Sequence, residues 1–172
     1  MNIFVLDKNP RLCAQYHCDK HVLKQIPDIA KILCTVMREN GIPYGYTSGN
    51  KNHPCVRWVA EADSNFVWLR ELGLELCKEY GYRYEKGAAD HASEGIIRNA
   101  YLKSLESMSK LKKASNLEEI TLPPLCIPDY LKLDDPIQAY RQYYLVEKAD
   151  LLSYTKRNVP EWITCMGMGE HR

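Results

Sequence analysis

The sequence lacks the features of membrane and secreted proteins. None of its apolar runs approaches the roughly 20 residues that a membrane-spanning helix needs. Its opening residues, Met-Asn-Ile-Phe-Val-Leu-Asp, are too few and too quickly acidic for a signal peptide. The chain also contains no internal repeat and no low-complexity segment. These absences predict a cytoplasmic protein whose 172 residues form one domain with a sizeable core.

The cysteines lack the spacing of a disulfide framework or a zinc ribbon. There are seven of them, an odd number, and no two form a Cys-x-x-Cys pair. We therefore expect reduced thiols. A strong excess of charge is missing as well, because the formal net charge is only +1. That value does not indicate nucleic-acid binding by itself, although a local basic patch is sufficient for it.

Apolar residues recur with a period of about 3.6 along most of the chain, which predicts an all-α fold. We expect a single compact domain, residues 1–172, of three to four main helices with a short extended N-terminal segment. That segment, residues 3–6, is either a short strand or a chain laid across the helices. The main helices are expected at 11–40, with a kink or break at Pro27, and at 54–81, 91–113 and 136–157.

Residues 16–25, Tyr-His-Cys-Asp-Lys-His-Val-Leu-Lys-Gln, hold the densest set of candidate catalytic groups. In one continuous helix, four of them share a face over two turns: His17, Lys20, His21 and Lys24. Crowded cations lower the pKa of a lysine, and the neutral amine is then available as a nucleophile or base. The same face can instead grip phosphate as a set of point charges, or simply face water.

A metal site is a second interpretation of this stretch. His17 and His21, spaced i, i+4, suit a shared metal ion. Further ligands would come from His53, Glu61, Asp63 or His91. The sequence contains no Glu-x-x-His repeat of the kind that paired helices use for metals, and two histidines on a partly solvated face are the alternative. We therefore predict no metal, and name His17 and His21 as the ligands if one is bound.

Residues 52–55 carry a candidate anion site. His53 lies at the expected start of a helix, where free backbone N–H groups and the helix dipole bind anions. The alternative is that Asn52 or His53 only caps the helix. We assign His53 to catalysis, and Asn52 and Arg57 to substrate binding.

The last expected helix mixes aromatic rings with a cation. Tyr140, Arg141 and Tyr144 are the residues that we assign to substrate binding there. Aromatic rings stack on exposed bases while arginine contacts phosphate. Alternatively, the tyrosines pack this helix onto the core.

With these residues in place, the chain resembles the phage-type pyrimidine-dimer DNA glycosylases, the endonuclease V-like ultraviolet-repair enzymes. The motifs follow one another in the right order over most of the length: Leu-Cys-Ala-Gln-Tyr-His at 12–17, Lys-Gln-Ile-Pro-Asp at 24–28, His-Pro-Cys-Val at 53–56, Trp-Leu at 68–69, Cys77, Gly-Tyr at 81–82 and Ala-Tyr-Arg-Gln-Tyr-Tyr at 139–144. The resemblance implies an all-α DNA enzyme of a bacterial or phage-infected cell. Such enzymes flip a base out of the duplex, attack the sugar C1′ with an amine and break the strand through an imine, with no cofactor.

Three positions depart from the pattern of that family. The family uses the α-amine of a threonine exposed by removal of the initiator methionine, whereas position 2 here is Asn, which usually leaves Met1 in place. The resemblance puts the family's catalytic glutamate on Gln25, whose amide cannot act as a carboxylate base. It puts the last arginine of the motif on Asp28. If the chemistry is retained, the candidate amines are Lys20, Lys24 and Met1, and the candidate acids are Asp19 and Asp28.

We therefore predict a DNA glycosylase/lyase-like enzyme that acts on a damaged or modified pyrimidine base through an amine nucleophile. One alternative is an enzyme of phage-like DNA hypermodification, which modifies a nucleobase or nucleotide and holds phosphate on the cationic face. The other is a His-ligated metal-binding helical protein. The expected partner is DNA or a nucleotide, with no membrane contact, and the oligomeric state stays open. The residues assigned to catalysis are His17, Asp19, Lys20, His21, Lys24, Gln25 and His53.

Overall fold

The computed structural model describes residues 2–47, 49–106 and 119–167, and within these ranges the chain is helical, with no strand. The α-helices are α1 (Pro10–Tyr16), α2 (Asp19–Glu39), α3 (Pro54–Glu61), α4 (Asp63–Tyr84), α5 (Glu94–Glu106), α6 (Pro136–Glu147) and α7 (Glu161–Gly167). Three 3-10 turns connect some of them: η1 (Ala88–Asp90), η2 (Asp129–Leu131) and η3 (Ala149–Leu151). The predicted all-α class is confirmed. No helix in these ranges is long and apolar enough to cross a bilayer.

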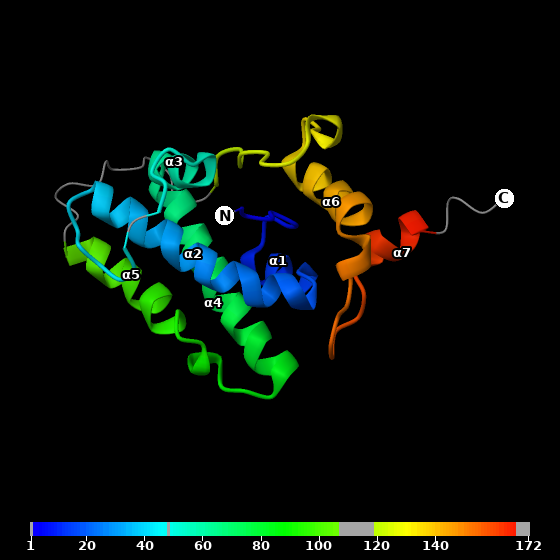
Figure 1. Ribbon diagram of the computed structural model, residues 1–172, viewed down its shortest axis with the longest axis horizontal. Helices are drawn as coiled ribbons and strands as arrows, with labels where there is room; N and C mark the ends of the chain where they lie inside the picture. The colour runs from blue at the N-terminus through cyan, green and yellow to red at the C-terminus, as the bar shows by residue number, and fades with distance from the viewer. Residues whose placement is uncertain (1, 48, 107–118, 168–172) are drawn as a thin grey trace.

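Helices α2 and α4 form the centre of the fold and pack against each other (Figure 1). α4 also contacts α1, α3 and α5, whereas α6 and α7 lie on the side opposite α5. The apolar stripe of α2 is completely buried, including Val22, Ile26, Ile29 and Leu33. Positions three and four apart share one helix face, so this stripe is what fixes α2 in the core.

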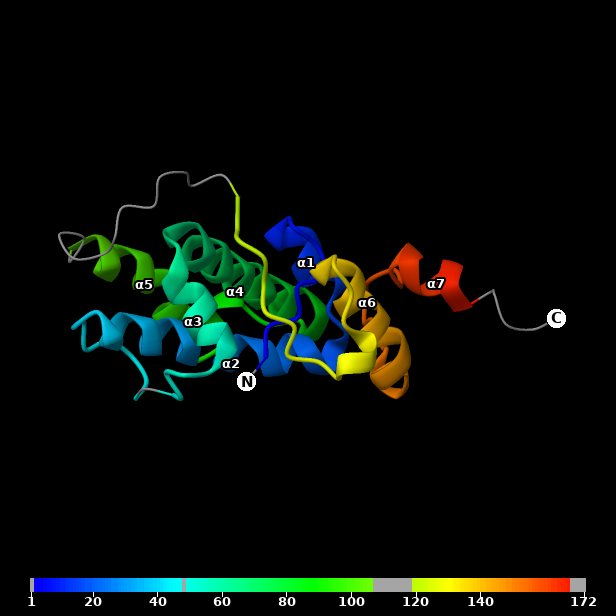
Figure 2. The ribbon, with the colours of Figure 1, turned by 90° about the horizontal axis from the view of Figure 1, so that it is seen from above.

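Residues 3–6 are extended and buried between α2 and α6. The ring of Phe4 stacks on His21 of α2, with centroids 4.5 Å apart, and meets Tyr140 and Tyr144 of α6 edge-on. The chain laid across the helices is therefore the confirmed alternative. Residues 119–128, called the strap below, have no helical structure and run beside this N-terminal segment toward α6 (Figure 2).

The helix predicted at 11–40 is two helices. α1 ends at Tyr16, His17 takes extended backbone angles (φ −66°, ψ 132°), and α2 begins two residues later. The buried guanidinium of Arg83 on α4 donates to the carbonyls of Gln15 and His17, at 3.0 and 2.8 Å. These carbonyls are bound by a side chain and not by a continuing helix, so the break lies here. The prediction of one helix face holding His17, Lys20 and His21 together is therefore wrong.

Of the kink or break predicted at Pro27, the break is wrong, because α2 runs through this residue. A proline inside a helix removes the hydrogen bond to the carbonyl four residues earlier. That residue is Leu23, which is 40% exposed, so water can satisfy the carbonyl. The helix predicted at 54–81 breaks instead at Ala62, where the Asn65 side chain binds the Trp58 carbonyl at 2.8 Å.

The last two predicted helices differ in length from the structure. The one expected at 91–113 begins at Glu94, and its residues 107–113 lie outside the described ranges. The one expected at 136–157 ends at Glu147. Beyond it, the carbonyl of Ser153 accepts from the backbone N–H of Asp19 at 2.9 Å. The chain leaves the helical conformation to cap α2, and the unpredicted α7 follows.

Candidate active site

Asn2 is hydrogen-bonded to residues of α2, α6 and the strap. Its backbone carbonyl accepts from Gln25 Nε2 at 2.9 Å. Its side-chain Nδ2 donates to the carbonyl of Cys126 at 3.0 Å, and its Oδ1 accepts from the hydroxyl of Tyr140 at 3.2 Å. Three elements far apart in sequence therefore fix the amino-terminal end of the chain, which remains partly accessible.

Gln25, which donates to the Asn2 carbonyl, is the buried member of this group of residues. Its side chain is 0% exposed, and its Oε1 has no hydrogen-bond partner among the described residues. One turn further along α2, Asp28 Oδ2 is buried and also lacks a partner there. An unsatisfied buried acceptor costs about 1–3 kcal/mol, so this pair favours a donor brought to it. An amine or a substrate hydroxyl is such a donor.

Asn52 and Arg57 lie on the other side of the strap. Both are exposed, and with Leu122 and Pro124 of the strap they line an open pocket of about 510 Å³. His53 caps α3, because its Nδ1 accepts from the backbone N–H of Cys55 at 3.2 Å. The structure thus brings the 52–57 segment to the strap that also touches Asn2.

The two histidines of the predicted stripe are buried and neutral. Burial lowers the pKa of His17 to about 3. Burial, with the nearby charges of Lys24 and Lys148, lowers the pKa of His21 to about 4. His17 Nδ1 lies 2.7 Å from the Cys13 carbonyl, which only accepts, so the proton of the neutral ring is on Nδ1. Its Nε2 is a buried acceptor without a partner in the described ranges.

His21 belongs to the aromatic core next to Asn2. Its Nδ1 lies 2.6 Å from the hydroxyl of Tyr144, and its ring is stacked on Phe4. Lys20 and Lys24, by contrast, are exposed on the outer side of α2. The predicted cationic face is therefore reduced to these two lysines, because neither histidine carries a charge near pH 7.

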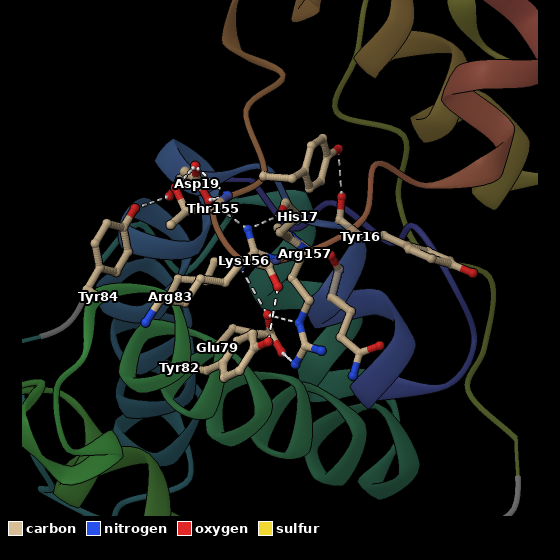
Figure 3. A network of polar contacts seen from close by, with 12 residues as sticks. Tyr16, His17, Asp19, Glu79, Tyr82, Arg83, Tyr84, Thr155, Lys156 and Arg157 are labelled. Carbon is tan, nitrogen blue, oxygen red and sulfur yellow. Dashed lines mark hydrogen bonds and ion pairs between the residues drawn. The ribbon is translucent and has the colours of Figure 1, made fainter.

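Asp19 is part of a buried ionic network (Figure 3). Arg83 bridges Asp19 and Glu79, each at 3.0 Å, and Thr155 donates to Asp19 through both its backbone N–H and its hydroxyl. Burial raises the pKa of Asp19, but the hydrogen bonds from Thr155 and Arg83 outweigh it and hold that pKa below its usual value. Arg157 pairs with Glu79 from the other side. The network ties the start of α2 to α4 and the C-terminal part, and keeps Asp19 ionised.

The aromatic cluster of α6 is directed into the core. Tyr140 and Tyr144 are both 0% exposed, so a base cannot stack on either ring in this conformation. Arg141 donates to the carbonyl of Leu6 at 2.9 Å and lies over the rings of Tyr16 and Trp162. The contacts therefore support the alternative raised for these tyrosines: they pack α6 onto the N-terminal segment.

Within the described residues, no three side chains of the His, Cys, Asp and Glu types come together as a metal-binding group. His17 and His21 are each engaged through Nδ1, by Cys13 and Tyr144 respectively. The other ligands proposed for them do not join them. A metal site at these histidines therefore has no support from the arrangement of their neighbours.

Sequence reasoning missed the side chain of Asn2 and the pair Cys55 and Cys126 as parts of the site. The cysteines were recognised only as reduced thiols. Cys126 lies 71 residues after Cys55, and nothing in the spacing indicates that their sulfur atoms lie 3.8 Å apart.

An all-α domain in which Asn2 is hydrogen-bonded to a glutamine of α2 agrees with the resemblance seen in the sequence. A family model described as pyrimidine dimer DNA glycosylase matches residues 1–91, which is more than half of the chain. The chain therefore belongs to this family. Membership supports a DNA glycosylase-type enzyme with DNA as its substrate. No curated protein and no solved structure matches the chain significantly.

The matched region ends within the connection between α4 and α5. It includes Asn2, Gln25 and the 52–57 segment, but neither the strap nor α6. The site is thus assembled from both parts of the chain.

Proposed function

We propose that the protein is a DNA glycosylase/lyase that acts on a damaged or modified pyrimidine, and that the α-amine at the start of the chain is its nucleophile. The observation that carries the proposal is the 2.9 Å hydrogen bond from Gln25 to the carbonyl of Asn2. It joins the amino-terminal end of the chain to the position where the resemblance puts the catalytic carboxylate. Lys20 and Lys24 point to solvent on α2 and are assigned to phosphate contacts instead.

The reaction begins when the neutral α-amine attacks C1′ of the target nucleotide. The bond from C1′ to the base breaks, its electron pair leaves with the base, and the base takes a proton. The amine loses its own proton as the sugar ring opens to an imine. Removal of a C2′ proton then expels the 3′ phosphate and breaks the strand. Each step after the attack requires a proton acceptor or donor.

Gln25 can position the amine or the sugar by hydrogen bonding, but its amide cannot exchange protons in this way. Asp28 lies one turn along the same helix, is half-buried and has an unpartnered oxygen in the described ranges. We therefore assign the proton transfers to Asp28, and assign Asn52 and Arg57, beside the strap, to holding the DNA.

Borohydride trapping tests this function directly, because it reduces the imine to a stable adduct. The substrates are duplexes with an abasic site, a thymine dimer or a hypermodified pyrimidine. An adduct that maps to the N-terminal peptide, and that persists in a Lys20→Ala/Lys24→Ala double variant, supports the proposal. Protein with an acetylated amino terminus serves as the matched control and should give no adduct. An adduct on either lysine, or none on any substrate, contradicts it.

The departure at Gln25 favours a second candidate, an enzyme that modifies a nucleobase or nucleotide on the same fold. Loss of the carboxylate removes the base that imine chemistry uses, whereas phosphate binding by Lys20, Lys24 and Arg57 does not need it. Calorimetric titration with nucleotides and with DNA tests this candidate. If the protein binds neither nucleotides nor DNA, this second candidate is excluded. The metal-binding alternative is tested by elemental analysis of protein purified without a histidine tag, where an absence of stoichiometric metal would exclude that alternative.

A further inference from the structure

Two cysteine thiols lie in contact next to Asn2. Cys55 belongs to the first turn of α3, and Cys126 belongs to the strap. Their sulfur atoms are 3.8 Å apart. Cys55 Sγ also lies 3.9 Å from Asn2 Oδ1, and the carbonyl of Cys126 accepts from Asn2 Nδ2 at 3.0 Å. The thiol pair and the amino-terminal site therefore share one residue.

The two thiols differ in accessibility and in charge. Cys55 is fully buried, whereas Cys126 is only partly buried. The contact with Cys55, with help from the charge of Lys132, lowers the pKa of the Cys126 thiol. The same contact and burial raise the pKa of Cys55. The reactive thiolate thus forms on the sulfur that solvent can reach, and the protonated thiol lies behind it.

Among the described cysteines, only this pair combines an accessible thiol of lowered pKa with a second thiol in contact. Burial raises the pKa of the Cys13 and Cys77 thiols to about 12, and both are buried. Cys165 is exposed, on the short helix α7. An accessible thiol with a second thiol in contact is the arrangement in which oxidation ends in a disulfide and not in an over-oxidised cysteine.

We propose that Cys126 is a site of reversible oxidation by peroxide, that Cys55 resolves it as a disulfide, and that this disulfide alters the amino-terminal site. The Cys126 thiolate attacks one oxygen of hydrogen peroxide, the O–O bond breaks, and the leaving hydroxide takes up a proton to become water. Cys126 is then a sulfenic acid. The sulfur of Cys55 attacks the sulfur of Cys126, its proton goes to the departing oxygen, and a second water leaves. Two thiols are oxidised, the peroxide is reduced to two waters, and a dithiol reductant reverses the change.

The geometry supplies both the reaction and its consequence. A disulfide requires a sulfur–sulfur distance of about 2.05 Å, so the pair must close by less than 2 Å. The strap has no helical hydrogen bonds to break, and near Cys126 it is held by the hydroxyl of Tyr140, which contacts the Pro124 carbonyl at 2.7 Å and the Cys126 N–H at 3.4 Å. Because the Cys126 carbonyl accepts a hydrogen bond from the side chain of Asn2, a shift of the strap toward α3 moves Asn2, the residue that follows the amino terminus.

The test for the disulfide uses full-length reduced protein treated with hydrogen peroxide, followed by thiol blocking and peptide mapping. We expect a Cys55–Cys126 crosslink that dithiothreitol removes. In Cys55→Ser, a sulfenic-acid probe should label Cys126 at least tenfold faster than Cys165. In Cys126→Ser, Cys55 should stay unlabelled. A disulfide that maps elsewhere, or labelling of Cys126 no faster than that of Cys165, overturns the proposal.

The test for the consequence measures the rate at which an amine-reactive ester acylates the amino terminus, near neutral pH. This readout needs no DNA, so it stands whether or not the glycosylase proposal is correct. Oxidation should change the rate severalfold in wild-type protein, reversibly, and should leave it unchanged in Cys55→Ser. Equal rates for the reduced protein and the fully crosslinked protein refute the coupling to the amino-terminal site.

Discussion

The buried histidines predict a loss of stability on mild acidification. Burial lowers the folded-state pKa of His17 to about 3 and that of His21 to about 4, both below the usual histidine value of 6.5. Between pH 6.5 and those values, the unfolded chain binds protons that the folded chain does not. Unfolding is therefore favoured as the pH falls. The folded state has its full stability, as far as these two histidines determine it, only above pH 6.5.

The magnitude follows from the pKa difference. Between pH 7 and pH 5, the uptake of a proton by the unfolded chain alone lowers the free energy of unfolding by about 2 kcal/mol per histidine, at about 1.4 kcal/mol per pH unit. The two side chains are 0% and 4% exposed, so solvent screening reduces this little. Together His17 and His21 lower the free energy of unfolding by about 4 kcal/mol. This is a large part of the free energy of unfolding of a typical protein, about 5–15 kcal/mol. Asp19 does not contribute in this window, because its folded pKa lies below the usual carboxyl value.

Urea denaturation followed by circular dichroism at pH 7 and pH 5 measures the effect. With a typical m-value of about 2 kcal/mol per molar, the midpoint should fall by about 2 M urea. His17→Asn is the matched variant, because its Nδ2 can replace the donor to the Cys13 carbonyl without titrating. Its midpoint should shift by only about half as much as that of the wild type. Equal shifts in both proteins would show that His17 is not the titrating group.

Three further predictions concern single residues. Arg83→Met leaves Asp19 and Glu79 without their buried partner and should lower the free energy of unfolding by about 3–5 kcal/mol, whereas exposed Arg98→Met should change it by less than about 1 kcal/mol; similar urea midpoints for the two variants would contradict the role of the network. Gln25→Glu restores a carboxylate beside Asn2 and should raise the yield of borohydride adduct at least tenfold over the wild type, while an unchanged or lower yield would argue against α-amine catalysis. Lys20→Ala and Lys24→Ala should each weaken DNA binding and lower its salt slope by about 1 without changing the adduct yield, and unchanged salt slopes would remove the lysines from the interface.

The sequence was sufficient for the helical class because the apolar stripe of α2 has a clear period, and its members are buried as a set. It was not sufficient for the helix boundaries. Pro27 was the strongest breaking signal, yet the helix tolerates it beside an exposed carbonyl. The real break, at His17, is caused by Arg83, which lies 66 residues away along the chain. Tertiary hydrogen bonds of this kind leave no local pattern.

The candidate site was predictable only in part for the same reason. Gln25 and Asp28 were found through the resemblance, and Gln25 is hydrogen-bonded to Asn2. The histidines were misread because a spacing of four residues was taken as one helix face. Asn2, Cys55 and Cys126 carry no motif. They become neighbours because the strap passes beside Asn2. The strap has no helical periodicity, so its sequence does not indicate which of its residues face the helices.

The division of the site between the two parts of the chain bears on how the reaction is specified. The part that matches the family contains Asn2 and Gln25, whose hydrogen bond carries the proposed function, and Asp28, to which proton transfer is assigned there. The groups that hold the Asn2 side chain, Cys126 and Tyr140, come from the part beyond residue 91. A change in the strap can therefore move Asn2 without altering the helix that carries Gln25. Differences in substrate between this chain and other members of the family are thus expected to originate in residues 119–144, where exchange of that segment would test them.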